Sequence, residues 1–405
     1  MTNRKWIVAI AIGAAMWASG RASAQNFQND GPAVKNKAQY AVPIPMGTSG
    51  FNIAKGDCAT GTLGSLVQDA DGLKYILSNN HVLALANQGN KNVDPIKHVG
   101  TLDTAGCAGL GTLAVATLTQ FQPIDFVNPN MVDAAIAKIN TGSAKADIVA
   151  IPGFNPATEV PVLNRVVIKS GRTSGVTKGT ISAVNVTINV NYVVNGVVKV
   201  AQFTNQIAIT PVIPVAFFSQ PGDSGSLIFQ CDTTDKNWHP VGLLFAGGLV
   251  QQVNNGWVFI INTTFGNTLQ NVTTAFHNLG VDLTFVAPSA ASPDCTAVAA
   301  ATMAQAIPAG APDVNNLQEE FLRTPQGVAA LASANAVKDH YNQFLTTQEG
   351  VIGAGVGFSD KGTEQIVIKV FVRSDAGPGT LSKLPKVLDG VVVEAVVAPP
   401  TIIAL

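Results

Sequence analysis

Ser224 lies in the segment Gly222-Asp223-Ser224-Gly225-Ser226, whose residue types suit a nucleophile turn. Gly222 and Gly225 allow a tight backbone path with positive φ, which can turn the serine hydroxyl outward. The same path can direct the amides of Gly222 and Ser224 into one small space, where they would hold a developing oxyanion in acyl transfer. The alternative is an ordinary Gly/Asp/Ser turn between two strands. The enzymatic interpretation therefore requires a base and a carboxylate elsewhere in the chain.

His81 and Asp133 precede Ser224 and supply those two residue types. A serine hydroxyl is a weak nucleophile until a base takes its proton, and imidazole suits that role near neutral pH. A buried carboxylate orients the imidazole and stabilises the imidazolium. Asp133 heads an apolar alternation, where an unpaired charge is costly, so a buried partner is expected. Asp125 is a competitor in a proline-flanked loop, and purely structural roles for His81 and Asp133 remain the alternative.

Short apolar runs separated by turns predict that β-strands position these residues. A hairpin formed by 62–67 and 73–78 leads directly into His81. A second set of strands runs from 162 to about 285, and its Asn195-Gly196 pair is a strong hairpin signal. The other expected strands are 112–120, 180–194, 197–210 and 241–245.

The chain divides by composition into an export segment, a double β array and a smaller C-terminal module. In the module, Thr324 and Pro325 predict a helix over 324–347 with a natural N-cap, and Gly350 would end it. Strands are expected at 355–358, 366–372 and 391–397, with a short helix over 381–388. The predicted divisions are 1–24, 25–50 (an N-terminal arm), 51–285 (a first barrel over about 51–150 and a second over about 151–285), 286–312 (a linker) and 313–405 (a helical plus small α+β module).

Residues 1–24 have the layout of a secretory signal. Arg4 and Lys5 precede an apolar stretch, and small residues at 22–24 form a cleavage site. Removal after Ala24 would give a secreted or periplasmic protein, because no later stretch is long and apolar enough to cross a bilayer. With 12% charged residues and a net charge of −1, the chain has no feature that favours nucleic acid or an anionic membrane as a partner.

Four cysteines occur, an even number that suits disulfides in an exported chain. Three connectivities are possible, and proximity along the chain favours Cys58 with Cys107 and Cys231 with Cys295. No cysteine or histidine spacing is typical of a metal site, and no motif indicates a cofactor. Nothing in the sequence indicates an oligomeric state.

Three segments resemble motifs of the trypsin-like (chymotrypsin-fold) serine peptidases. Segment 77–83 (Leu-Ser-Asn-Asn-His-Val-Leu) is similar to the histidine motif, 133–136 (Asp-Ala-Ala-Ile) to the aspartate strand, and 222–226 to the nucleophile motif. Segments 169–175 and 241–248 also resemble bacterial members. The sequences Ser-Asn-Asn-His-Val-Leu-Ala and Leu-Leu-Phe-Ala-Gly-Gly are especially similar to those of the branch related to plant NARROW LEAF 1 proteins.

The resemblance covers roughly 51–285 and implies a mainly β fold with two antiparallel barrels. It places His81 and Asp133 in the first barrel and Ser224 in the second, with an extended peptide in the cleft between them. It also implies that the amides of Gly222 and Ser224 form the oxyanion hole. In animal members a freed N-terminus pairs with the aspartate before the serine. No matching sequence begins this barrel, so Asp223 needs another partner.

The resemblance also indicates a primary substrate pocket. Phe218, six residues before the serine, would form its floor, and Phe245, Ala246 and Gly247 would form a wall. Neither place offers an acid for a Lys or Arg side chain, so an uncharged, apolar substrate residue is expected.

The expected function is that of an exported serine endopeptidase acting on a protein or peptide through a His-Asp-Ser triad and an acyl-enzyme. The alternative is a catalytically silent binding or scaffold protein on a peptidase fold, because fold alone does not fix function. A third possibility is a self-cleaving peptidase that its C-terminal module regulates or delivers. The glycine-rich segment 350–357 in that module lacks the ending of a phosphate-binding loop and favours a strand.

Overall fold

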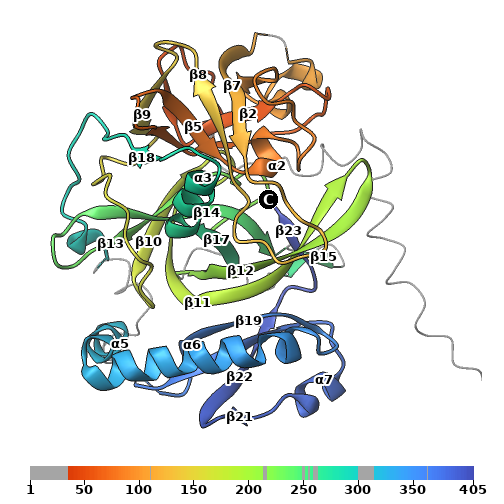
Figure 1. Ribbon diagram of the computed structural model, residues 1–405, viewed down its shortest axis with the longest axis vertical. Helices are drawn as coiled ribbons and strands as arrows, with labels where there is room; N and C mark the ends of the chain where they lie inside the picture. Colours follow the sequence, from red (N-terminus) through yellow and green to blue (C-terminus); the bar gives the residue numbers. More distant parts are fainter. Residues whose placement is uncertain are drawn as a thin grey trace, which may run out of the picture.

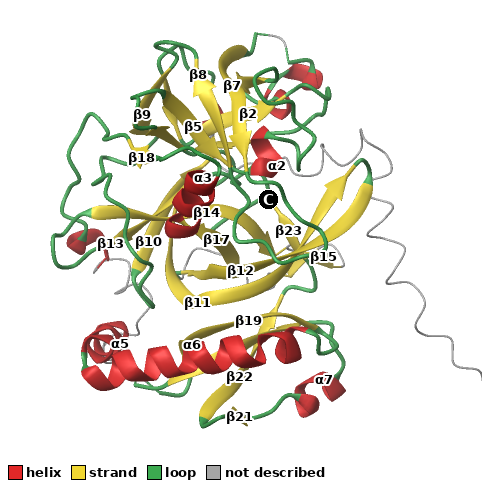
Figure 2. Cartoon of the chain, in the orientation of Figure 1, coloured by secondary structure: helices red, strands yellow, loops and turns green. Residues whose placement is uncertain are grey.

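The computed structural model describes residues 35–109, 111–212, 217–248, 251–253, 256–258, 263–299, 314–362 and 364–405. The expected export segment 1–24 lies outside these residues. Two β-rich bodies lie one above the other in Figure 1, and a helical module lies beneath the second of them. Strands dominate the upper two bodies and helices lie mainly in the module, as Figure 2 shows.

The second barrel is a closed ring of antiparallel strands. The ring is complete because β10 pairs with both β13 and β11. The remaining pairings connect β13 to β14, β14 to β17, β17 to β12 and β12 to β11. The ring strands are β10 (Val166–Gly171), β11 (Gly175–Val194), β12 (Val197–Pro211), β13 (Leu227–Cys231), β14 (Trp238–Gly248) and β17 (Thr264–Thr268).

The first barrel is an eight-stranded sheet in the order β18-β4-β5-β8-β7-β6-β2-β3. Gly64 joins β3, at one end of the sheet, directly to β4, which is next to the strand at the other end. The expected hairpin is β4–β5, which leads into the short helix α2 (Asn80–Leu83) that carries His81. The strands are β2 (Thr48–Asn52), β3 (Gly61–Leu63), β4 (Ser65–Gln68), β5 (Lys74–Ser78), β6 (Pro95–His98), β7 (Leu113–Phe121), β8 (Ala135–Ile139) and β18 (Thr284–Phe285).

Together with the module below, these two arrays confirm the predicted fold class, which is mainly β with two antiparallel barrels of chymotrypsin type. Strand β2 already begins at Thr48, within the segment expected to be an N-terminal arm. The remaining short elements are 3₁₀ turns at Lys35–Lys37, Thr101–Asp103 and Ala105–Cys107, the parallel pair β1 (Ile44–Met46) and β9 (Ala144–Ile148), the hairpin β15 (Gln251–Val253) and β16 (Gly256–Val258), and the helix α3 (Leu269–Asn278).

The longest pairing in the second barrel joins β11 to β12, as the Asn-Gly signal predicts. Asn195 and Gly196 have φ of 52° and 75°, the positive values that a two-residue hairpin turn requires. The register pairs Val194 directly with Val197 across the turn. Strand β11 extends beyond the ring, and its distal part pairs with strands of the C-terminal segment.

The C-terminal module contains the expected helix and three strands. In α6 (Pro325–Thr346), Thr324 is the N-cap and its hydroxyl accepts the Gly327 amide at 3.0 Å. Val328, in the first turn of α6, is 57% exposed. The other elements are α5 (Val314–Arg323), β19 (Val351–Phe358), β20 (Ile366–Arg373), α7 (Pro378–Lys383), β21 (Val387–Leu388), β22 (Val391–Ala398) and β23 (Ile402–Ala404).

The short helix predicted over 381–388 is wrong in its bounds. Helix α7 ends at Lys383, and Leu384 takes an extended conformation with ψ of 132°. Pro385 explains the early end, because the residue before a proline disfavours helical backbone. Within the described residues, no helix is long and apolar enough to span a membrane.

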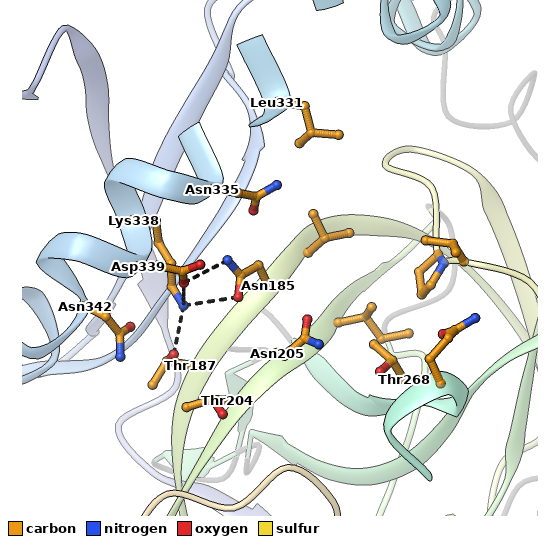
Figure 3. A pocket seen from close by; sticks show the side chains of 15 residues that line it. Asn185, Thr187, Thr204, Asn205, Thr268, Leu331, Asn335, Lys338, Asp339 and Asn342 are labelled. Carbon is orange, nitrogen blue, oxygen red and sulfur yellow. Dashed lines mark hydrogen bonds and ion pairs between the residues drawn. The ribbon is translucent and has the colours of Figure 1, made fainter. Parts of the chain in front are cut away.

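The module docks on the second barrel by extending its sheet. Strand β19 pairs antiparallel with β11, with Val356 opposite Val184 and Ala354 opposite Thr187. From α6, the buried Lys338 ammonium donates to Thr187 Oγ1 at 2.9 Å (Figure 3). Sheet pairing and this polar contact together fix the module on the barrel.

Both disulfides have the pairing favoured from the sequence. Cys58 bonds to Cys107 in the first barrel, and Cys231 bonds to Cys295 beside β13. The second bond ties the segment that follows α3 back onto the second barrel. Such crosslinks stabilise a fold mainly by restricting the unfolded chain.

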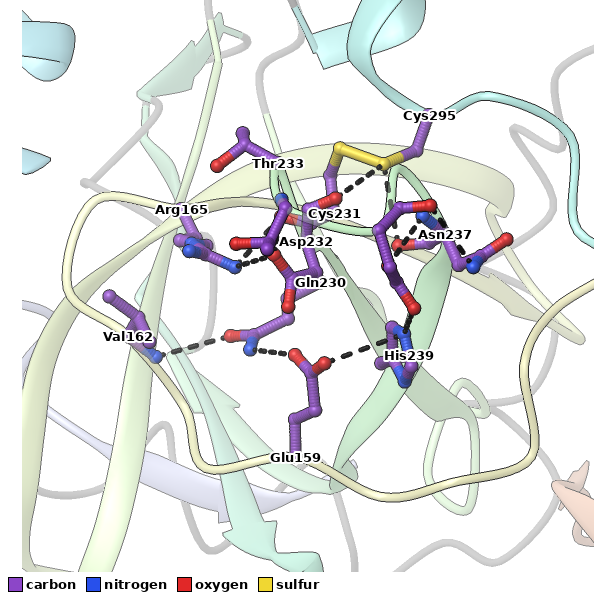
Figure 4. Close-up of polar contacts among 12 residues, drawn as sticks. Glu159, Val162, Arg165, Gln230, Cys231, Asp232, Thr233, Asn237, His239 and Cys295 are labelled. Atoms are coloured by element: carbon purple, nitrogen blue, oxygen red, sulfur yellow. Dashed lines mark hydrogen bonds and ion pairs between the residues drawn. A yellow bond between two sulfur atoms is a disulfide. The ribbon is translucent and has the colours of Figure 1, made fainter.

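His239, on β14, lies in a network of polar residues beside the second disulfide (Figure 4). Its Nε2 is 2.8 Å from Asp235 Oδ2 and 3.4 Å from Glu159 Oε1, and its Nδ1 is 2.9 Å from the Ala157 carbonyl. Burial alone would lower the pKa of His239, but the Ala157 hydrogen bond and the two carboxylates outweigh it and raise this pKa. The network holds the 149–161 connection between the barrels against β14.

We expect His239 to stabilise the fold more at pH 5.5 than at pH 8. A raised folded-state pKa means that the protonated ring stabilises the folded state fully below the unfolded pKa of about 6.5. That contribution is lost as the pH rises through the folded pKa. Urea unfolding of the wild type and of His239→Gln at the two pH values measures it. His277→Gln is the control, because that side chain is 68% exposed. An equal loss of unfolding free energy at both pH values would contradict this expectation.

Candidate active site

The structure brings His81 and Asp133 into direct contact between the barrels. His81 Nδ1 lies 2.6 Å from Asp133 Oδ2, and the His81 backbone amide donates to Oδ1 at 3.2 Å. The Asp133 side chain is fully buried, whereas that of His81 remains 13% exposed. Asp125 has a different environment, since its carboxylate accepts the amides of Val127 and Asn128 in an exposed turn. Asp133 is therefore the carboxylate that orients this imidazole.

Asp133 has further partners that sequence reasoning missed. Tyr192, on β11, donates its hydroxyl to Asp133 Oδ2 at 2.8 Å. Asn79 donates to the Asp133 carbonyl at 2.7 Å, and Asn267 Oδ1 accepts the Asp133 amide at 3.0 Å. Burial and the Asp133 charge raise the pKa of Tyr192 well above its usual value, so the phenol remains a donor at neutral pH. Tyr192 thus contacts the carboxylate, while Asn79 and Asn267 hold the Asp133 backbone in place.

The predicted turn around Ser224 has a backbone conformation that glycine adopts without strain and that other residues rarely adopt. Gly222 and Gly225 have φ of 95° and 94°, values that favour glycine. A Cβ at Gly225 would lie 2.1 Å from Ser78 Oγ and 2.2 Å from the Thr62 carbonyl, so no larger residue fits. Within the described chain, the amides of Gly222 and Ser224 have no hydrogen-bond acceptor. Two free donors beside one serine are what an oxyanion requires.

The first barrel holds this turn of the second barrel in place. The Thr62 amide donates to the Ser224 carbonyl at 2.8 Å, and its hydroxyl donates to the Gly222 carbonyl at 2.9 Å. The Thr62 hydroxyl in turn accepts the Arg172 amide at 2.9 Å. A single residue of β3 therefore fixes the nucleophile turn at both of its glycine-flanked ends.

The Ser224 hydroxyl and the His81 ring are not bonded to each other. Ser224 Oγ donates to the Phe245 carbonyl at 3.2 Å. His81 Nε2, the nitrogen that would face the serine, lies 3.2 Å from the Leu405 backbone oxygen. The base and the nucleophile thus have other partners in this arrangement.

Lys169 is the partner of Asp223 that could not be identified from the sequence. Its ammonium lies 3.2 Å from Asp223 Oδ2, and both side chains are fully buried. The same carboxylate accepts the amides of Thr173 and Gln220 at 2.8 and 2.9 Å, and it is bonded to the Ser174 hydroxyl. Burial lowers the pKa of Lys169, while the Asp223 charge opposes that effect. An internal lysine is thus the buried counter-ion of Asp223.

The four residues expected to form a substrate pocket have different environments. Phe218 is fully buried in the apolar cluster that also contains Leu405. The Phe245 ring packs against Phe203 with centroids 4.8 Å apart, whereas its backbone carbonyl accepts from Ser224 Oγ and the Leu405 amide. Ala246 and Gly247 form the strand edge that pairs with β23.

The described chain also contains a cavity of about 670 Å³ away from these residues. It lies between α6 and the second barrel and is lined by polar residues such as Asn185, Asn335 and Lys338 (Figure 3). None of the predicted site residues lines it. Among the described residues, no cluster of three or more His, Cys, Asp or Glu side chains could hold a metal ion.

Comparison with known proteins gives one family match. The family model described as the Nal1 C-terminal domain matches residues 131–280, less than half of the chain. The matched segment contains Asp133 and Ser224 but not His81. No curated protein matches the chain.

Several solved serine proteases resemble the chain at low identity. A glutamic acid specific serine protease is 16% identical with a TM-score of 0.38, covering 60% of this chain and 100% of its own. The Cellulomonas bogoriensis chymotrypsin is 16% identical with a TM-score of 0.36, covering 60% and 99%. Thermobifida fusca Protease A is 14% identical with a TM-score of 0.34, also covering 60% and 99%.

We expect Lys169→Met to destabilise the protein by about 3–5 kcal/mol, because it leaves the Asp223 charge buried without its counter-ion. Adding Asp223→Asn should restore much of this loss, since neither buried charge then remains. Urea unfolding of the single and double variants measures the free energies. Lys74→Met, at an exposed position of β5, is the matched control. Equal stability of Lys169→Met and the control would show that the ion pair does not hold the turn.

Proposed function

We propose that this protein is a serine endopeptidase that uses His81, Asp133 and Ser224. The carrying observation is the 2.6 Å contact between His81 Nδ1 and the buried Asp133 carboxylate, beside a glycine turn that presents Ser224 and two free amides. A histidine oriented by a buried carboxylate is suited to act as a general base. Its remaining nitrogen, Nε2, faces the backbone oxygen of Leu405.

In the proposed reaction, the Ser224 hydroxyl first turns from the Phe245 carbonyl toward His81 Nε2. His81 takes the hydroxyl proton as Oγ attacks the peptide carbonyl carbon, and Asp133 stabilises the imidazolium. The amides of Gly222 and Ser224 donate to the oxyanion. His81 then gives its proton to the leaving amine, which leaves an acyl-enzyme on Ser224 that water hydrolyses by the same steps.

The proposed substrate is an extended peptide with an uncharged, apolar residue before the cleaved bond. The edge of β14 at Phe245–Gly247 can pair with an extended strand, as its pairing with β23 illustrates. Phe218 belongs to the same apolar cluster as Leu244 of this strand. A charged substrate side chain would lose hydration there without gaining a partner.

One observation favours a second candidate function, a catalytically silent binding protein. Ser224 Oγ donates to the Phe245 carbonyl instead of His81, and Leu405 occupies the partner position at His81 Nε2. The missing hydrogen bond between Ser224 and His81 is also compatible with a peptidase, because catalytic hydrogen bonds often form only in the substrate complex. Reactivity of Ser224 therefore separates the two candidates.

We further propose that the protein is exported and belongs to the branch related to NARROW LEAF 1. The two disulfides suit an oxidising compartment. The match to the Nal1 C-terminal domain over residues 131–280 supports the branch assignment.

A fluorophosphonate probe should label Ser224, and Ser224→Ala should abolish the labelling. Asp133→Asn should slow it by roughly 10⁴-fold, because the imidazole then loses its orienting charge. Gel fluorescence and peptide mass mapping measure the rate and the labelled residue. Ser182→Ala, in β11, is the matched control. Labelling that persists in Ser224→Ala would contradict the assignment.

Tyr192→Phe should slow labelling by about 10- to 100-fold, since it removes a hydrogen bond to a charged group worth about 1.5–3 kcal/mol. Tyr75→Phe is a matched control, because Tyr75 donates to Asp69 at the same 2.8 Å but away from His81. An unchanged rate in Tyr192→Phe would show that Tyr192 does not position Asp133 for the reaction.

A further inference from the structure

The C-terminal strand β23 lies between β14 and β11, in a space that we call the groove. It pairs antiparallel with β14, with Ile402, Ile403 and Ala404 opposite Gly248, Gly247 and Ala246. On its other side, Ile403 pairs with Asn191 of β11. Figure 1 shows β23 and the chain end beside α2, the helix that carries His81. The segment therefore adds a strand between two edges of the barrel.

Leu405 continues this strand to the reactive residues. Its amide donates to the Phe245 carbonyl at 3.1 Å, and its oxygen lies 3.2 Å from His81 Nε2. His81 Nδ1 faces Asp133 Oδ2, so each ring nitrogen lies within hydrogen-bond distance of an oxygen atom. The backbone oxygen of Leu405 thus occupies the position through which His81 would reach Ser224.

The side chains of the segment alternate between two apolar clusters. Ile402 is 2% exposed and joins the cluster of Phe203, Phe245 and Phe371. On the other face, Leu405 is 8% exposed and joins the cluster that contains Phe218. This burial is what a bound peptide with two anchored side chains would have.

Gly247 makes room for the Leu405 side chain. A Cβ at position 247 would lie 2.9 Å from Leu405 Cδ1 and 3.5 Å from Cδ2. Ser219 Oγ would lie 3.4 Å from the same point. The space beside Gly247 therefore holds a branched aliphatic side chain. The Lys169 ammonium lies 6.0 Å from the centroid of the Phe218 ring, which belongs to the cluster that Leu405 joins, but this ammonium is paired with Asp223.

The module presents this segment to the groove. Strand β22 ends at Ala398, whose carbonyl accepts the Ser374 amide at 2.8 Å, and Pro399 packs on Gly248. The module itself is fixed to β11 through β19. Only a short connection separates this fixed strand from Ile402.

We infer that Ile402–Leu405 is a tethered, substrate-like inhibitor of the groove, with Leu405 in the primary pocket. This inference rests on the proposed endopeptidase function and names its substrate class, peptides with a branched aliphatic residue before the cleaved bond. The C-terminal module regulates the site by holding this segment in place. Release of the segment exposes the groove to other peptides.

The expected increase in groove accessibility on release of the segment can be calculated from the tethering of the segment. A short linker gives an effective concentration on the order of millimolar. If the free segment binds with a Kd of about 0.1 mM, about a tenth of the grooves are open, and release raises accessibility about tenfold.

Two variants release the segment by different means. Leu405→Asp places a charge in an apolar pocket, and Ile403→Pro removes the amide that faces Gly247. Val397→Asp is the matched control, because it adds the same charge at a 50% exposed position of β22. Thermal unfolding of each full-length variant verifies folding.

The first measurement is the rate of fluorophosphonate labelling, expected to rise about tenfold in both release variants and not in Val397→Asp. The second is fluorescence anisotropy with a dye-labelled peptide Pro-Thr-Ile-Ile-Ala-Leu, the sequence of residues 400–405. This peptide should bind the release variants, bind the wild type about tenfold more weakly, and slow labelling of the variants. Among peptide 4-nitroanilides, Leu405→Asp should give a higher kcat/KM for Ile-Ala-Leu than for Ile-Ala-Lys or Ile-Ala-Glu.

The outcomes separate this inference from the proposed function. Equal labelling and equal peptide binding in wild type and release variants would overturn the inference while leaving the endopeptidase intact. Peptide binding confined to the release variants, with no labelling of any protein, would uphold the occupied groove and refute the peptidase. Preference for Lys or Glu over Leu in the released enzyme would overturn the assigned substrate class.

Discussion

The close approach of the two barrels at Gly64 and Gly225 is the constraint on which the site depends. A Cβ at Gly64 would lie 1.9 Å from the Gly225 carbonyl oxygen, so the two backbones are nearly in contact there. This proximity lets Thr62 bond to both Gly222 and Ser224. The position of the nucleophile turn is thus set by the barrel that also carries His81. The glycines at the junction explain why two separate barrels can share one site with defined geometry.

Two buried carboxylates flank this junction, and each is stabilised by a distant residue. Asp223 has the Lys169 ammonium and several amides, while Asp133 has His81 and the Tyr192 phenol. A buried charge without such partners costs several kcal/mol, so these contacts must form together with the fold. The lysine makes the Asp223 pairing independent of any new N-terminus. The turn is therefore already ordered in the intact chain.

Local signals predicted much of the fold, whereas the site contacts are largely nonlocal. Asn195-Gly196 specified its hairpin, and Thr324 with Pro325 specified the start of α6, because each acts through neighbouring backbone. The motifs around His81 and Ser224 marked candidate chemistry through residue type and glycine spacing. Tyr192 is 59 residues from Asp133, and Leu405 is 324 residues from His81. No spacing rule connects such pairs, since only the folded sheet brings them together. Helix α7 was misplaced for a local reason, the proline after Leu384.

Strand β11 connects the two barrels and the C-terminal module, which were predicted as separate parts of the chain. It closes the second barrel through β10 and β12, presents Tyr192 to Asp133, and pairs with β19 and β23 of the C-terminal segment. Because side chains on a strand alternate between its faces, a shift in its register would move all of these contacts at once. The position of the groove-filling strand and that of the Tyr192 phenol therefore both depend on the register of β11. A displacement of the module along β11 would alter both the occupancy of the groove and the environment of His81.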